Sequence, residues 1–140
     1  MYSKMTISNL KTVLPAELHR VWDVVTDVRR YPDWRSDVER VEVPGAREFW
    51  EYTRGEYVTK FTITKEETGR RWELAMENDN MTGHWVGVFR QRGTATIVDF
   101  TEYVTAKKLW MKPFVKLYLK RQQAQFAADL RAALETRRSA

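Results

Sequence analysis

Residues 13–43 read VLPAELHRVWDVVTDVRRYPDWRSDVERVEV, and this stretch decides the fold. Pro15 fits the first turn of a helix, because a proline there gives up no hydrogen bond. Apolar side chains then recur at helical spacing, at Leu18, Val21, Trp22 and Val25. The sequence Tyr31-Pro32-Asp33-Trp34 forces a turn and begins a second, short helix, and after Asp37 the period becomes two, as in a strand. Two small helices between a first and a second strand are unusual, and they indicate a fold built to hold a cavity.

The rest of the chain predicts a meander of strands followed by one long helix. We expect a first strand, two helices and six further strands over residues 5–13, 15–26, 30–36, 38–43, 47–54, 56–66, 71–78, 83–91 and 94–105. The last segment, about 113–138, has the apolar stripe of a helix long enough to cross a whole sheet. The predicted architecture is α+β, with one strongly bent, seven-stranded antiparallel sheet around this C-terminal helix, in a single domain of residues 1–140.

Composition argues against several classes of protein. The chain of 140 residues has no cysteine, which excludes disulfides and thiolate metal sites. It contains neither a signal peptide nor an apolar run of the ~20 residues that span a membrane, so we expect a cytoplasmic protein. Its two histidines, His19 and His84, have no partner at metal-ligand spacing, and its glycines form no phosphate loop. We therefore expect no metal and no cofactor.

Much of the net charge of +5 lies between Lys107 and Arg138. A solvated helix face accounts for this basic segment, and no nucleic-acid-reading motif accompanies it, so we expect no nucleic acid partner. The six Trp, six Tyr and six Phe are more informative, because aromatic side chains form cores and also line cavities for flat or greasy ligands.

The whole pattern resembles the START-like, Bet v 1-type (SRPBCC) superfamily, and within it the polyketide cyclase/dehydrase-like group. The resemblance rests on Leu14-Pro15-Ala16, Val21-Trp22, Thr26-Asp27, Tyr31-Pro32-Asp33-Trp34, Trp50-Glu51, Gly83-His84-Trp85 and Gly93-Thr94. It implies a helix-grip fold whose cavity, between the sheet and the C-terminal helix, holds an apolar or aromatic molecule. This superfamily includes lipid and sterol carriers, aromatic polyketide cyclases, coenzyme Q-binding proteins and chaperone activators, and no short signature of theirs matches catalytic positions here.

Strand alternation selects the side chains that we expect to bind the ligand. On the strands they are Tyr57, Thr59, Phe61, Ile63, Trp72, Leu74, Met76, Asn78, Trp85, Phe89, Val98 and Phe100. From the long helix we expect Val115, Leu119, Gln122 and Phe126. In the strand over 47–54 the alternation is ambiguous, because Phe49 and Glu51 compete with Trp50 and Tyr52 for the inner face. An apolar wall with a few polar groups is typical of a small-molecule site.

Glu51 and Glu102 are the candidate catalytic residues. A carboxylate inside an apolar pocket has a raised pKa and can act as a general acid or base. The alternative is that both carboxylates lie at strand ends, or pair with Arg or Lys across the sheet.

Three functions follow from these observations. The first is binding of a hydrophobic or aromatic small molecule, lipid- or polyketide-like; the second is a polyketide cyclase or dehydratase that uses the same cavity; the third is an interaction module of the chaperone-activator kind. Trp110, Met111 and Phe114, flanked by lysines, predict either transient membrane contact during lipid loading or a hydrophobic staple at the helix start. A monomer and a homodimer are both compatible with the sequence.

Overall fold

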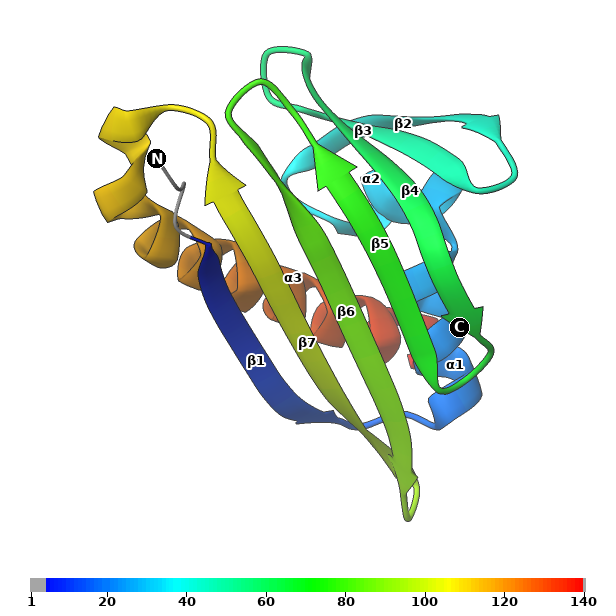
Figure 1. Cartoon of the computed structure of the whole chain (residues 1–140). Helices are drawn as coiled ribbons and strands as arrows, with labels where there is room; N and C mark the ends of the chain where they lie inside the picture. The colour runs from blue at the N-terminus through cyan, green and yellow to red at the C-terminus, as the bar shows by residue number, and fades with distance from the viewer. Residues whose placement is uncertain (1–4, 140) are drawn as a thin grey trace.

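The computed structural model describes residues 5–139 and has the expected helix-grip fold (Figure 1). Its strands are β1 (Thr6–Leu14), β2 (Val38–Gly45), β3 (Glu48–Thr53), β4 (Tyr57–Glu67), β5 (Arg71–Glu77), β6 (Met81–Arg92) and β7 (Ala95–Ala106). Its helices are α1 (Leu18–Thr26), α2 (Tyr31–Trp34) and α3 (Val115–Ser139), with short 3-10 helices η1 (Val28–Arg30) and η2 (Leu109–Phe114). The predicted α+β class, with a long C-terminal helix, is confirmed.

The boundaries of some elements differ from the expected ones for local reasons. The first helix begins at Leu18 rather than Pro15, because the Ala16 N–H turns back to donate to the Leu14 carbonyl (2.9 Å). The last helix begins at Val115, since Pro113 falls inside the preceding 3-10 turn η2. β6 begins at Met81, two residues earlier than expected, where Met81 pairs with Ala106 of β7.

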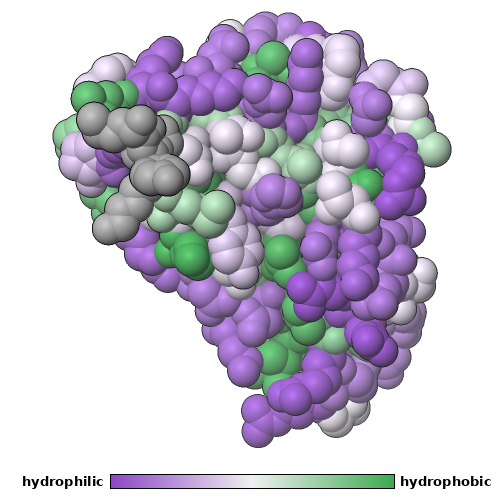
Figure 2. Space-filling model, viewed as in Figure 1, coloured by the Kyte–Doolittle hydropathy of each residue, from purple (hydrophilic) through white to green (hydrophobic). Residues whose placement is uncertain are grey.

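The seven strands form one antiparallel sheet in the order β1-β7-β6-β5-β4-β3-β2. β1 therefore closes the sheet beside the last strand, and the two small helices connect the opposite edges. In Figure 1 the sheet curves in front of α3, which crosses its inner face. Figure 2 shows the outer face as mostly hydrophilic, with hydrophobic side chains scattered rather than gathered in one patch. The inner face is thus the one that offers apolar surface to a ligand.

The two ends of α3 pack on different parts of the core. Leu130 and Leu134 belong to a large cluster with α1 and the middle of the sheet, whereas Val115 and Leu119 pack with Met81 and Val104. Between these ends, polar residues interrupt the apolar stripe of the helix. One of them, Gln123, is tied to β1, since it accepts a hydrogen bond from the Ser8 hydroxyl (2.7 Å) and donates to the Ser8 carbonyl (3.0 Å). The middle of α3 is therefore held at the sheet without filling the space in front of it.

Candidate functional site

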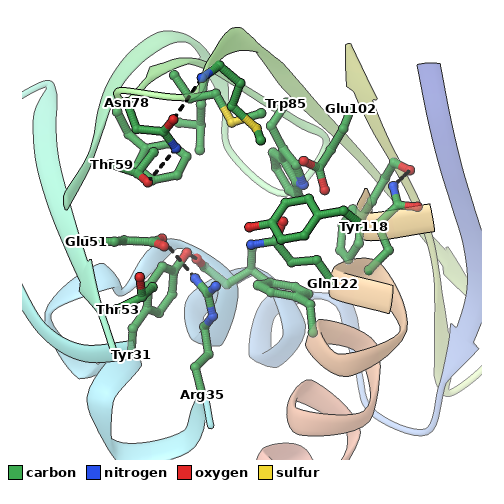
Figure 3. Close-up of a pocket in the computed structure, with 18 of the residues that line it drawn as sticks. Tyr31, Arg35, Glu51, Thr53, Thr59, Asn78, Trp85, Glu102, Tyr118 and Gln122 are labelled. Carbon is green, nitrogen blue, oxygen red and sulfur yellow. Dashed lines mark hydrogen bonds and ion pairs between the residues drawn. The ribbon is translucent and has the colours of Figure 1, made fainter. Parts of the chain in front are cut away.

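A cavity lies between the middle of α3 and the inner face of the sheet (Figure 3). The volume of the cavity, taken as the space in which the centre of a water molecule fits, is about 100 Å³. Since one water needs about 10–15 Å³ of such space, the cavity has room for on the order of ten non-hydrogen atoms. The side chains around it are Val25, Tyr31, Arg35, Glu51, Thr53, Tyr57, Thr59, Phe61, Trp72, Leu74, Met76, Asn78, Met81, Trp85, Phe100, Glu102, Tyr118, Gln122, Gln123 and Phe126.

Aromatic rings in mutual contact form the wall of the cavity. Trp85 stands edge-on to Trp72 (centroids 5.9 Å apart) and lies beside Phe100 (4.9 Å), which in turn meets Phe126 of α3 (5.7 Å). A glycine makes this arrangement possible, because a Cβ atom at position 87 would lie 2.5 Å from the Trp85 ring. Gly87 thus leaves room for the indole beside the backbone of β6, and the wall presents ring faces and edges to a ligand.

One end of the cavity contains a buried ion pair. Arg35, just after α2, donates from Nη1 to Glu51 Oε2 (2.8 Å) and from Nη2 to Asp37 Oδ2 (3.0 Å). Its guanidinium also lies over the rings of Tyr31 (4.9 Å) and Phe126 (5.1 Å). Burial raises the pKa of Glu51. The nearby Arg35 guanidinium lowers this pKa, but the effect of burial is larger. Burial alone would lower the pKa of Arg35, but the two carboxylates outweigh it and raise that pKa, so Arg35 stays charged.

Glu102 differs from Glu51 because no described residue is paired with it. It lies on β7, opposite Trp85 of β6, with 8% of its surface exposed. Within the described residues its carboxylate makes no hydrogen bond and no ion pair, and Figure 3 shows it among the aromatic rings. Burial raises the pKa of Glu102 to about 7, and the distant Arg35 only partly opposes this shift. Glu102 is therefore a cavity group that can exchange a proton near neutral pH.

Hydroxyl and amide groups complete the polar part of the cavity. Asn78 Nδ2 donates to the Thr59 hydroxyl (3.1 Å), while its Oδ1 accepts from the backbone N–H groups of Asn80 and Met81 (2.9 Å each). These bonds fix the orientation of the amide. The Tyr57 hydroxyl is buried and lacks a hydrogen-bond partner among the described residues. It is thus available to a ligand.

Most of the residues predicted from strand alternation lie on the cavity. They are Tyr57, Thr59, Phe61, Trp72, Leu74, Met76, Asn78, Trp85, Phe100, Gln122 and Phe126, together with the candidate acids Glu51 and Glu102. In β3, where the alternation was ambiguous, Phe49 and Glu51 point inward. The Phe49 ring stacks on the ring of Phe61, with centroids 4.8 Å apart. Whether these side chains bind a ligand stays a prediction.

Five predicted residues lie away from the cavity, in the packed core. They are Ile63, Phe89, Val98, Val115 and Leu119. Phe89 contacts Trp22 of α1 edge-on (5.0 Å), because α1 covers the end of the sheet where Phe89 lies. The inner face of the sheet is longer than the cavity, so alternation identifies the face without showing where the cavity ends.

Sequence reasoning missed several residues of the site. They are Val25, Tyr31, Arg35, Thr53, Met81, Tyr118 and Gln123. Tyr118 precedes the predicted Gln122 by four residues, and this spacing indicates that the two side chains lie on the same face of the helix. Arg35 carried no such signal, because it follows α2 outside any periodic segment and reaches Glu51 only in the folded chain.

An open groove adjoins the cavity beside η2. It offers about 250 Å³ and shares Tyr57, Asn78, Met81 and Tyr118 with the cavity. Its other side is formed by Asn80, Trp110, Met111, Phe114 and Val115. The groove therefore lies between the cavity and the exposed side chains of η2.

A bent antiparallel sheet that holds a cavity against a long C-terminal helix defines the START-like, Bet v 1-type class. Residues 14–131 match the family described as polyketide cyclase / dehydrase and lipid transport, and the chain belongs to this family. No curated protein sequence matches the chain. No helix within residues 5–139 is long and apolar enough to cross a membrane.

Solved structures share the fold at low sequence identity. A START superfamily protein from Mycobacterium smegmatis has a TM-score of 0.86 at 13% identity, with 93% of this chain and 97% of that one covered. The Zhui aromatase/cyclase from Streptomyces sp. R1128 has a TM-score of 0.76 at 15% identity, with 96% of each chain covered. Norcoclaurine synthase from Thalictrum flavum, solved with dopamine and hydroxybenzaldehyde, has a TM-score of 0.74 at 12% identity, with 95% and 88% covered.

Proposed function

We propose that this protein binds a small aromatic or hydrophobic molecule in the cavity between the sheet and α3. The observation that carries the proposal is the wall of touching aromatic rings around an unfilled space of about 100 Å³, interrupted by a few polar groups. Native interiors are close-packed by default, so an unfilled space of this composition is typical of a ligand site. Its size favours a compact ligand over an extended lipid chain.

Calorimetric titration with 2-phenylethanol tests this proposal. Gln122 lies on the cavity, whereas Gln125, one turn away, is exposed, so the two positions make a matched pair. Gln122→Trp should fill the space and abolish binding, and Gln125→Trp should leave it unchanged. Equal binding by the two variants would place the ligand elsewhere. Mass spectrometry of the small molecules released from denatured, natively sourced protein would then identify the natural ligand.

Glu102 favours a second candidate function, catalysis of the cyclase or dehydratase kind. An unpaired carboxylic acid with a pKa of about 7 can both give and take a proton at neutral pH. The aromatase/cyclase with the same fold is consistent with this chemistry. The test is turnover of a short poly-β-ketone chain by wild-type protein and by Glu102→Gln. Product formation that does not change in this variant would remove Glu102 from the mechanism.

The exposed side chains of η2 support a transient contact with membranes during loading. We call Leu109, Trp110 and Phe114 of η2, together with Leu117 in the first turn of α3, the η2 patch; they are 77%, 69%, 61% and 54% exposed. Since Trp110 and Phe114 are so exposed, packing inside the protein is a poor explanation for them. Lysines 107, 108, 112, 116 and 120 flank the patch in the sequence, as expected of a segment that meets anionic headgroups.

A further inference from the structure

We infer that the cavity selects a small aromatic molecule that carries a protonated amine, with the amine at Glu102 and the ring against Trp85. The inference rests on the proposed function and adds the ligand class to it.

The charges around the cavity argue for a cationic ligand. Arg35 is the only cation among the described lining residues. Its guanidinium already forms ion pairs with the carboxylates of Glu51 (N–O distance 2.8 Å) and Asp37 (3.0 Å). In the described part of the chain the Arg35 Nε has no partner, but that atom is buried from solvent, and two carboxylates already balance the charge of the guanidinium. Glu102 is therefore a surplus negative charge. A carboxylate ligand would be repelled here, and an ammonium would be attracted.

The position of Glu102 provides a place for the amine. Its carboxylate is buried and has no partner within residues 5–139, which is an unfavourable state for a charged group unless a donor approaches it. Trp85 is its direct partner across β6 and β7, and Phe100 packs on that indole. An ammonium beside Glu102 thus gains a charge-assisted hydrogen bond and an aromatic neighbour for cation–π attraction.

The size of the cavity limits the rest of the ligand. Room for on the order of ten non-hydrogen atoms accommodates one aromatic ring with a short aminoalkyl chain. The ring can lie against Trp85 and Phe126, which both line the space, while the amine lies at Glu102 of β7.

Three ligands of similar size and different charge show whether affinity depends on the charge of the ligand or on its shape. We would titrate 2-phenylethylamine, 2-phenylethanol and 3-phenylpropionate into the protein by calorimetry at pH 8 and at pH 6. At pH 8 the amine should bind at least tenfold more tightly than either of the others. Its affinity should fall about tenfold at pH 6, because Glu102 must then lose a proton on binding, whereas an alkylamine stays protonated at both pH values.

The contribution of Glu102 to the pH dependence of binding has to be distinguished from that of the other titratable groups. Tyr31, Arg35, Glu51, Tyr57 and Tyr118 face the cavity, while His84 lies exposed on the outer side of β6. Neither Arg35 nor a tyrosine changes charge between pH 6 and 8, so Glu51 is the group to test against. In Glu102→Gln the amine should lose its advantage over 2-phenylethanol, and the pH effect should disappear. A pH effect that persists in this variant would arise from Glu51 and would overturn the inference.

The outcomes distinguish this inference from the proposed function. If 2-phenylethanol or 3-phenylpropionate binds as tightly as the amine, the inference is overturned and the proposed function stands. If none of the three binds, both are overturned. Trp85→Leu provides a second variant, whatever the folding yield of Glu102→Gln: it should weaken both ligands, and the amine more than the alcohol, because only the ammonium also loses its cation–π contact. Equal weakening of the two ligands would contradict an amine beside Trp85.

Discussion

Trp85 and Glu102 face each other across β6 and β7, so an aromatic ring and an unpaired carboxylate occupy neighbouring positions on the cavity wall. Antiparallel pairing brings the side chains of directly opposed residues together on one face of the sheet. The site therefore depends on the register between β6 and β7. Twelve residue pairs between the two strands hold this register.

The unpaired Glu102 carboxylate should make stability depend on pH. Burial raises its pKa from 4.5 to about 7 in the folded protein, so ionisation opposes folding. The penalty is absent below about pH 4.5 and fully present above about pH 7, where it approaches about 3 kcal/mol. Glu102→Gln should thus gain stability over wild type in urea unfolding at pH 8, and much less at pH 5. An equal gain at both pH values would contradict this origin.

Removing Arg35 should destabilise the protein strongly. Arg35→Met leaves Glu51 buried without its partner, which typically costs about 3–5 kcal/mol. Adding Glu51→Gln removes the uncompensated charge and should restore part of the lost free energy of unfolding. Arg40→Met is the control, because Arg40 pairs with Glu42 and Glu56 on the exposed surface and should matter far less. A double variant no more stable than Arg35→Met would refute this account of the ion pair.

Gly87 should be required for the position of the Trp85 ring. The new Cβ of Gly87→Ala would lie 2.5 Å from that ring, so the indole must move, at a cost of about 1–3 kcal/mol. Tryptophan fluorescence should change and 2-phenylethanol should bind more weakly. Gly45→Ala meets no atom within 4 Å and should shift the unfolding free energy by less than about 0.5 kcal/mol. Similar behaviour of the two variants would show that the ring does not depend on Gly87.

The η2 patch should bring the protein to anionic vesicles. Co-sedimentation with phosphatidylglycerol vesicles should exceed that with phosphatidylcholine vesicles and should weaken at high salt, which screens the lysines. The double change Trp110→Ser and Phe114→Ser should abolish it. Val13→Ser, which alters another exposed apolar side chain (43% exposed) on β1, should have no effect. Undiminished sedimentation of the double variant would end the membrane hypothesis.

Periodicity and turn residues predicted the helices and strands because these patterns span whole elements and their ends. The alternation of Trp72, Leu74 and Met76 defined the inner face of β5, and the turn at Gly69 separated that strand from β4. Such local patterns depend only on neighbours in the chain, so they can be read without coordinates.

The limits of the cavity depend on tertiary packing, which no local pattern contains. Phe89 has the same alternation as Trp85 but is covered by α1, whereas Trp85 faces open space. Arg35 joins the site through its contact with Glu51, sixteen positions away. For the same reason the sequence left open whether Glu102 was paired, and only the fold shows it without a partner.

The indole N–H signals of the tryptophans report directly whether a ligand enters the cavity. In a ¹H–¹⁵N NMR titration with 2-phenylethanol, we predict saturable shifts of the Trp85 and Trp72 signals, since both line the cavity. The signal of Trp50, which lies outside the cavity beside Lys60, should stay in place. Shifts confined to Trp50 or Trp110, or no saturable shift of Trp85, would contradict a ligand site between the sheet and α3.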